Sequence, residues 1–401
     1  MTNISSFKSG GLLPQEEKVE LKKESKSLFI GVPKESAFKE SRIPIVPDAV
    51  QLLVSHGHEV LIETGAGDGS NFTDNEYSEA GAKVVYDKKE VFQADIILKV
   101  EPPTLDEIDL MKGRQTLISA LQIKTRNKEF ISKLSDKKIT CLAYEFIQDE
   151  VGIMPLIRSM SEIAGISSIL IASESLSNVN DGKGLLMGGI SGVTPTEVVI
   201  IGAGTVGEFA ARSALGLGAS VKVFDNSISK LRRLQNDINL RVFTSIIQPK
   251  VLSKSLRRAD VVIAALRSTE NRTPCVVTEE MVKNMKVGSV IIDVSIDQGG
   301  CVETSELTHH ARPTFEKYGV KHYCVPNIPS RVSRTASFSL SNILTPIVLR
   351  IGDFGGLENV ISSDTGLRQG VYICHGILTN KMVGDWFNMN YKEIDLLIAT
   401  M

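Results

Sequence analysis

A run of β-branched residues followed by regularly spaced glycines limits the fold of this sequence more than any other feature. Residues 198–201 are Val-Val-Ile-Ile, which favours a buried strand. Glycines then follow in the spacing G-x-G-x-x-G: Gly202, Gly204 and Gly207. The next apolar run ends in Asp225, at the spacing of about 20 residues expected in a dinucleotide-binding βαβ unit. The pattern therefore predicts a strand, a tight turn and a helix that together bind a dinucleotide.

Each position of this motif has a physical task. Gly202 permits the tight turn, Gly204 lets the backbone approach a pyrophosphate, and Gly207 lets the helix lie close to the strand. The helix is predicted to begin with Thr205 and Val206, so its first N–H groups and the positive end of its dipole would face the phosphates. The alternative is a glycine turn needed only for packing, and the neighbouring strand, helix and acidic residue argue against it.

The acidic residue indicates which dinucleotide is bound. Asp225 is expected to accept hydrogen bonds from both ribose hydroxyls, and its charge would repel a 2′-phosphate, which favours NAD over NADP. Lys230, Arg232 and Arg233 lie nearby and leave NADP open. A second glycine-rich run at 65–69 has no apolar helix after it at the right offset, so we predict a loop there and a single dinucleotide site.

Strand and helix patterns alternate twice along the chain. This alternation predicts an α/β fold with two doubly wound Rossmann-like domains and a functional cleft between them. We expect residues 1–27 to form a charged N-terminal extension and residues 28–154 to form a substrate domain, completed by 334–401. Residues 155–333 are predicted to form the NAD-binding Rossmann domain, with a long apolar helix from 155 to 178 joining the two units.

Composition excludes several classes of function. The 401 residues carry 45 Lys+Arg and 47 Asp+Glu, so there is no basic excess for nucleic-acid binding. We found no apolar run of the length expected for a membrane span and no signal-peptide pattern. The 5 cysteines contain no C-x-x-C pair, which favours reduced thiols over a disulfide framework or a metal site. We therefore predict a cytoplasmic protein without a metal or a membrane partner.

Several blocks together resemble the alanine dehydrogenase family, which shares a superfamily with the N-terminal part of nicotinamide nucleotide transhydrogenase. They are Ile-Gly-Val-Pro-Lys-Glu at 30–35 followed by Arg42, Gly-Ala-Gly at 65–67, Met-Ser-Glu-Ile-Ala-Gly at 160–165, Ile-Gly-Ala-Gly-Thr at 201–205, and Asp-Gln-Gly-Gly-Cys at 297–301. The resemblance covers about residues 28 to 380. It implies NAD-dependent, reversible oxidative deamination of L-alanine or a related small amino acid, and a homo-oligomer, usually a hexamer.

The resemblance also implies roles for individual residues. Arg42 would bind the substrate carboxylate through two hydrogen bonds, which suits guanidinium geometry. Met160 and Ser161 would line the nicotinamide end of the cofactor. Asp297 and Asn327 would lie at the mouth of the cleft, near the nicotinamide ribose and the reacting carbon, and Asp297 would assist catalysis.

Two positions depart from the family pattern. Members carry two lysines flanking a valine, the second of which contacts substrate, whereas this chain has Lys99, Val and then Glu101. A histidine that acts as acid or base in the family is Gln122 here, and an amide cannot shuttle a proton at neutral pH. Glu101 would serve as the base if burial raised its pKa. Lys99 and Glu101 are two residues apart on one predicted strand, so their side chains should share a face and could form an ion pair. Lys99 is also a candidate substrate ligand. By the same alternation, Lys124 should share the face of Gln122.

These departures leave other functions open. One is an NAD(P) transhydrogenase-like nucleotide-binding subunit, although 148–155 does not match the Arg-Gln-Asp loop of that family. Another is a dehydrogenase for a different amine, with a cationic group that Glu101 attracts. The last is a non-catalytic NAD-binding regulatory protein.

Overall fold

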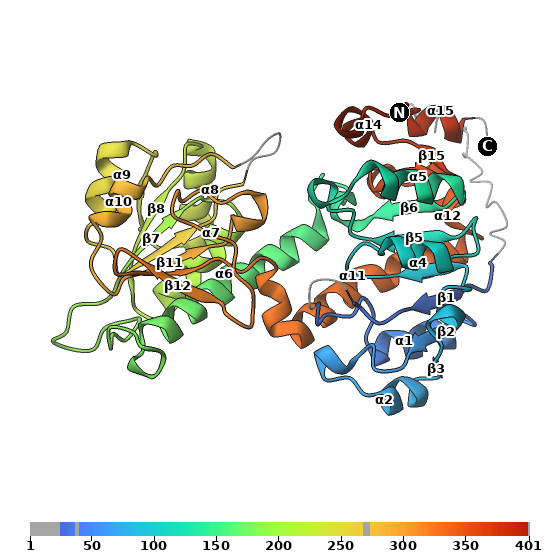
Figure 1. Ribbon diagram of the computed structural model, residues 1–401, viewed down its shortest axis with the longest axis horizontal. Coiled ribbons are helices and arrows are strands. Elements are labelled where there is room, and N and C mark those ends of the chain that lie inside the picture. Colours follow the sequence, from blue (N-terminus) through green and yellow to red (C-terminus); the bar gives the residue numbers. More distant parts are fainter. Residues whose placement is uncertain (1–24, 37–39, 268–272, 400–401) are drawn as a thin grey trace, which may run out of the picture.

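The computed structural model of the chain describes residues 25–36, 40–267 and 273–399. The predicted extension at 1–27 lies outside them except for residues 25–27. Figure 1 shows two lobes, each built around a sheet with helices on its faces. The predicted α/β class with doubly wound sheets is confirmed.

The first sheet has 8 strands in the order β15-β14-β6-β5-β4-β1-β2-β3. Strands β1 to β6 are parallel, and β14 and β15 extend the edge in antiparallel pairing. Its strands are β1 (Phe29–Val32), β2 (Glu59–Glu63), β3 (Lys83–Val85), β4 (Ile96–Leu98), β5 (Thr116–Ser119), β6 (Thr140–Ala143), β14 (Val371–Cys374) and β15 (Ile377–Leu378). The C-terminal part of the chain thus pairs with β6.

Short helices follow most of these strands. They are α1 (Pro47–Ser55), α2 (Asp74–Glu79), α3 (Lys88–Val91), α4 (Leu105–Leu110), α5 (Lys128–Asp136), α12 (Leu357–Ser363), α13 (Thr365–Arg368), α14 (Lys381–Phe387) and α15 (Ile394–Ile398). Two begin with capping boxes, in which Thr73 pairs with Glu76 and Thr104 with Glu107. These caps satisfy the first N–H groups of α2 and α4.

The second sheet has 7 strands in the order β12-β13-β11-β10-β7-β8-β9, parallel except for β12. Its strands are β7 (Glu197–Ile201), β8 (Ser220–Phe224), β9 (Phe243–Ser245), β10 (Val261–Ala264), β11 (Val290–Asp293), β12 (Thr314–Lys317) and β13 (Val320–Tyr323). Its helices are α7 (Thr205–Gly216), α8 (Ile228–Ile238), α9 (Pro249–Leu256) and α10 (Glu279–Lys283). The β-branched residues of β7 are fully buried at the centre of this sheet, as their sequence predicts.

Two long helices, α6 (Pro155–Leu176) and α11 (Ser333–Asp353), run between the lobes (Figure 1). Length and composition alone would let α6 cross a membrane. It packs instead against α7, α11 and β11, and Ile169 and Ala172 in its middle are fully buried. The core helices of globular proteins can be equally long and apolar, and these contacts identify α6 as a core helix.

Candidate active site

Polar side chains collect where strands of the first sheet end at their carboxyl edge. The loop after β1 carries Glu35, Glu40 and Arg42, and the segment after β4 carries residues 99–101. Gln122 follows β5 and begins the short turn η2 (Ile123–Thr125), and Glu145 lies in η3 (Tyr144–Phe146) after β6. Parallel strands bring such residues together at one edge, where α/β proteins place their sites.

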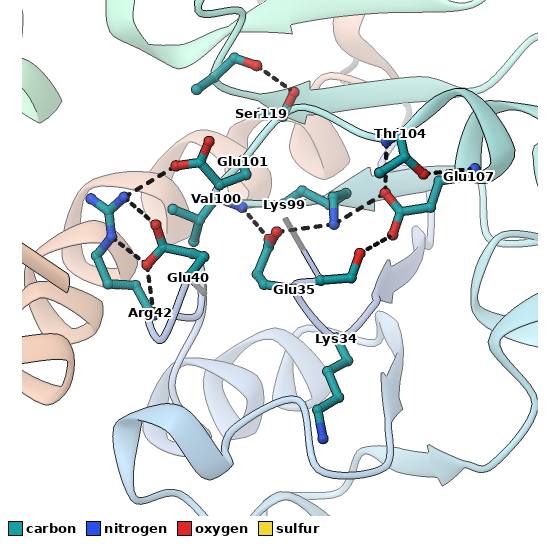
Figure 2. A network of polar contacts seen from close by, with 12 residues as sticks. Lys34, Glu35, Glu40, Arg42, Lys99, Val100, Glu101, Thr104, Glu107 and Ser119 are labelled. Carbon is teal, nitrogen blue, oxygen red and sulfur yellow. Dashed lines mark hydrogen bonds and ion pairs between the residues drawn. The ribbon is translucent and has the colours of Figure 1, made fainter. Parts of the chain in front are cut away.

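Arg42 is bound by Glu40 at two points. Its Nε lies 2.8 Å from Glu40 Oε1 and its Nη2 lies 2.6 Å from Glu40 Oε2 (Figure 2). Its Nη1 contacts the Sδ of Met160 in α6 at 3.4 Å, which joins two predicted site residues. Burial would raise the pKa of Glu40, but the charge and hydrogen bonds of Arg42 hold it at about 2. The pair is therefore ionised throughout the neutral range.

Glu40 also connects Arg42 to the segment before α11. Asn327 donates from Nδ2 to Glu40 Oε2 at 2.6 Å, and Ser330, in η6 (Ile328–Val332), donates from Oγ to Oε1 at 3.1 Å. Asn327, predicted at the cofactor, thus lies beside the predicted carboxylate-binding arginine. Glu40 was not among the residues predicted from sequence, although an acid two residues before an arginine assigned to the site was a signal for such a pair.

Glu101 contacts the same nitrogen of the Arg42 guanidinium as Glu40. Its Oε1 is 3.6 Å from Arg42 Nη2, and its Oε2 accepts a hydrogen bond of 2.5 Å from Nε2 of Gln122. The residue is only 4% exposed. Burial, together with the negative charge of Glu40, raises the pKa of Glu101 to about 7, against the opposing effect of Arg42. The structure therefore places a carboxyl group that titrates near neutrality next to the arginine.

Lys99 does not pair with Glu101 as we expected. Its Nζ lies 3.0 Å from Glu35 Oε2 and 3.5 Å from Glu107 Oε2, and Figure 2 shows these groups on the opposite side of Val100 from Arg42. The reason is that β4 ends at Leu98, so the alternation of a strand no longer governs residues 99–101. Lys99 is 1% exposed, a placement that favours a structural role. The side chain of Lys124 lies outside the described residues.

The three glycines of the G-x-G-x-x-G motif, at the turn from β7 into α7, differ in what surrounds them. A Cβ at Gly202, where φ is +114°, would lie 2.4 Å from the carbonyl oxygen of Ala265, and one at Gly207 would lie 1.9 Å from that of Gly202. A Cβ at Gly204 would have no atom within 4 Å. Packing within the protein thus explains two glycines and leaves the third facing open space. The open side of Gly204 is what a backbone that approaches a phosphate requires.

A pocket of about 140 Å³ lies at this glycine. Its lining includes Gly204, Asp225, Lys230 and Arg267. Asp225 is buried, and its carboxylate accepts hydrogen bonds from the N–H groups of Ala203 at 2.8 Å and of Ser227 at 2.7 Å. These bonds fix the acid at the end of β8, beside the start of α7. The residues present therefore fit the predicted dinucleotide.

The remaining predicted residues lie in three separate segments. Thr205 and Val206 begin α7, and Ser161 follows Met160 in α6. Asp297 lies in η5 (Ile296–Gln298), just after β11. The buried carboxylate of Asp293 holds this loop by accepting hydrogen bonds from the Ser295 N–H and the Ser305 hydroxyl. Burial raises the pKa of Asp293 to about 6.

Comparisons with known proteins agree with this geometry. The family models for the alanine dehydrogenase/PNT N-terminal and C-terminal domains match residues 31–164 and 168–381. The chain belongs to the alanine dehydrogenase/PNT family. Its relatives in this family include an alanine dehydrogenase of Bacillus subtilis, 40% identical over 89% of this chain and 94% of that protein, and one of Methanococcus maripaludis, 41% identical over 92% and 99%.

Solved structures show the same relationship. A structure of L-alanine dehydrogenase covers 90% of this chain and 99% of its own, with a TM-score of 0.84 and 37% identity. A transhydrogenase from Sinorhizobium meliloti shares the fold, with a TM-score of 0.75 and 24% identity over 88% of this chain and 99% of its own. Membership of the alanine dehydrogenase/PNT family is thus supported along both lobes.

Proposed function

We propose that this chain catalyses the reversible, NAD-dependent oxidative deamination of L-alanine or a related small amino acid in the cytoplasm, as a homo-oligomer. The observation that carries the proposal is the buried contact of Arg42 with Glu101, whose pKa is about 7, in a chain about 40% identical to alanine dehydrogenases. One group can bind a carboxylate, and the group beside it can hold or release a proton at neutral pH.

Arg42 would bind the carboxylate of the substrate. Glu40 already occupies Nε and one side of Nη2, so the substrate would meet the guanidinium from Nη1, the side that faces Met160. The pair with Glu40 fixes the guanidinium plane before substrate arrives, which lowers the cost of ordering it on binding. Arg42 is expected to orient the substrate with its amine toward Glu101.

Glu101 would take the place of the family histidine as the base. Deamination first requires the substrate ammonium to lose a proton, and then requires a water molecule to be activated so that it can attack the imine carbon. A carboxylate with a pKa of about 7 can accept the ammonium proton and release it to solvent, then accept a proton from the attacking water and pass it to the departing nitrogen. The reverse reaction uses the same transfers. Gln122, which cannot titrate, would keep Oε2 of Glu101 in place through its amide hydrogen bond.

The dinucleotide would be held by Gly204, Thr205, Val206 and Asp225. Its reactive end would lie toward Met160, Asn327 and Asp297. When bound, NAD supplies the acceptor for the hydride that leaves the substrate carbon. The carboxylate of Asp225 and the absence of a side chain at Gly204 support NAD at this position.

Two measurements on the purified chain test the proposal. NADH fluorescence should show binding at submillimolar concentration, and L-alanine with NAD⁺, or pyruvate with ammonium and NADH, should be turned over. NADH binding without turnover of either pair would favour a regulatory protein or a dehydrogenase for another amine. Failure to bind NADH would contradict the proposal as a whole. Size-exclusion chromatography with light scattering tests the homo-oligomer.

A further inference from the structure

Glu145 is a half-buried residue whose carboxylate the proposed chemistry does not use. It lies directly after β6, and its Oε1 accepts hydrogen bonds from the N–H groups of Leu121 at 2.7 Å and of Gln122 at 3.0 Å. Both N–H groups belong to the segment that leaves the end of β5. One oxygen of Glu145 therefore holds the backbone that presents the Gln122 side chain.

The backbone of Gln122 needs such support. Its φ of 48° and ψ of 51° lie in the left-handed region, which is unfavourable for a residue with a side chain. Relaxation of this backbone would turn the Gln122 amide away from Glu101, to which it donates at 2.5 Å. The position of the Glu101 carboxylate thus depends on Glu145 through Gln122.

The second oxygen of Glu145 lacks a partner. Oε2 is buried and takes part in no hydrogen bond among the described residues. Burial of the carboxylate raises the pKa of Glu145, and among the opposing contributions is the positive charge of Arg267. A buried carboxylate oxygen without a donor is unfavourable, and a nearby guanidinium would relieve that cost.

Arg267 belongs to the other lobe. It follows β10 of the second sheet, its side chain is exposed, and it lines the pocket that contains Gly204 and Asp225. The positive charge of Arg267 lowers the pKa of Glu145, but Glu145 Oε2 has no hydrogen-bond partner among the described residues. Arg267 thus borders the predicted cofactor pocket and also affects the pKa of Glu145, the residue that holds the Gln122 backbone.

We propose that Glu145 is a positioning residue for the Gln122–Glu101 pair, and that Arg267 completes it by pairing with Glu145 Oε2 when a dinucleotide occupies the pocket. The inference rests on the proposed function, because it assigns a purpose to the site described there. Its consequence is that binding of the cofactor in one lobe orders the base in the other.

A double-mutant cycle separates this coupling from direct effects on the cofactor. The Glu145→Gln variant keeps an oxygen for the two N–H groups and removes the charge. The Arg267→Gln variant removes the opposite charge from an exposed side chain, so it should fold. Glu150→Gln, which removes an exposed carboxylate from the same segment, is the matched control. NADH dissociation constants of the full chain are measured by fluorescence titration for each single variant and for the double variant.

Glu145→Gln should weaken NADH binding about fivefold or more in the wild-type background, which is within the usual range of coupling between sites, and less than about twofold in the Arg267→Gln background. Glu150→Gln should change nothing. An equal effect of Glu145→Gln in both backgrounds, or no effect in either, would overturn the coupling with Arg267.

A second measurement tests the positioning role. Glu145→Ala removes the acceptor as well as the charge, and should speed deuterium uptake of peptides covering residues 120–123 and lower kcat for L-alanine about tenfold or more while KM changes little. In a Gln122→Ala background the same change should leave kcat within about twofold. Unchanged deuterium uptake, or an equal loss of kcat in both backgrounds, would overturn the positioning role of Glu145. If Glu145→Ala does not fold, the isosteric Glu145→Gln variant supplies the kinetic comparison. Failure of the wild-type chain to bind NADH would contradict the proposed function, whereas binding and turnover without coupling would contradict this inference alone.

Discussion

Glu40 and Arg42 are only two residues apart, yet their side chains form a buried two-point ion pair, with Nε–Oε1 and Nη2–Oε2 distances of 2.8 and 2.6 Å. The loop after β1 folds back on itself to make this pair, and Asn327 and Ser330 fix it from the segment before α11. The charge of Arg42 is therefore balanced by a carboxylate before any substrate arrives. The ion pair between Glu40 and Arg42 therefore affects both the pKa of Glu101 and the free energy of folding.

Replacing Glu40 by Gln should affect stability and the proton affinity of Glu101 together. The variant removes the two-point carboxylate partner of the buried Arg42 guanidinium and leaves it only the 3.6 Å contact with Glu101. Breaking a buried ion pair typically costs about 3–5 kcal/mol of folding free energy. The negative charge of Glu40 contributes to the raised pKa of Glu101, so that pKa should fall below 7 in the variant. Denaturant unfolding measures the first effect, and the acidic limb of the pH profile for alanine oxidation measures the second. A limb that stays near pH 7 would contradict the assigned coupling between Glu40 and Glu101.

Glu101→Gln should lower kcat for L-alanine about 100-fold or more, since loss of a general base typically costs 100- to 10,000-fold. The new amide cannot accept a proton, so the limb near pH 7 should vanish as well. The control is Glu107→Gln, which alters a buried carboxylate on the Lys99 side of Val100 and should keep the limb where it is. Turnover by Glu101→Gln at the wild-type rate would show that Glu101 is not the base.

The raised pKa of Glu101 also makes stability depend on pH. Burial raises this pKa from 4.5 to about 7, so the folded chain binds more protons than the unfolded chain between these values. The contribution of Glu101 to stability is therefore fully present below pH 4.5 and is lost as the pH rises through 7. The free energy of unfolding of the wild type, relative to Glu101→Gln, should fall by about 1–3 kcal/mol between pH 5 and pH 8. Parallel pH profiles of stability for the two proteins would refute the shift.

Sequence patterns were sufficient for the parts of the fold that depend on local periodicity. The β-branched run of β7 and the glycines after it predicted the centre of the second sheet and the start of α7. These features depend on neighbours within a few residues. The fold class follows from them because alternating strands and helices have few ways to bury their apolar faces.

The site depended on contacts that spacing does not encode. Lys99 and Glu101 were expected on one face, but β4 ends at Leu98 and the two side chains diverge. The pairing of Asn327 with Glu40 joins residues 287 positions apart, and no local pattern reports it. Glu145 was within reach of prediction, because it follows β6 at the edge where the other strand ends had already been read as functional.

Substitutions at two glycines of the turn after β7 should separate effects on folding from effects on NADH binding. Gly204 has an ordinary extended backbone and precedes α7 as its cap, and a Cβ there would meet no atom of the protein within 4 Å. Gly204→Ala should therefore cost no more than about 1 kcal/mol of stability, the scale of a poorer cap. It should nevertheless weaken NADH binding about tenfold or more, because the methyl group would occupy the space through which the backbone approaches a pyrophosphate.

Gly202→Ala is the matched comparison, one methyl group placed two residues earlier. Its φ of +114° and the carbonyl oxygen of Ala265 at 2.4 Å oppose the new Cβ, so this variant should lose about 2–4 kcal/mol of folding free energy. Thermal or denaturant unfolding and NADH fluorescence, measured on both variants, give four values to compare. NADH binding by Gly204→Ala at wild-type strength would remove the dinucleotide from this turn, because the space that a methyl group fills would then not be the space that the ligand needs.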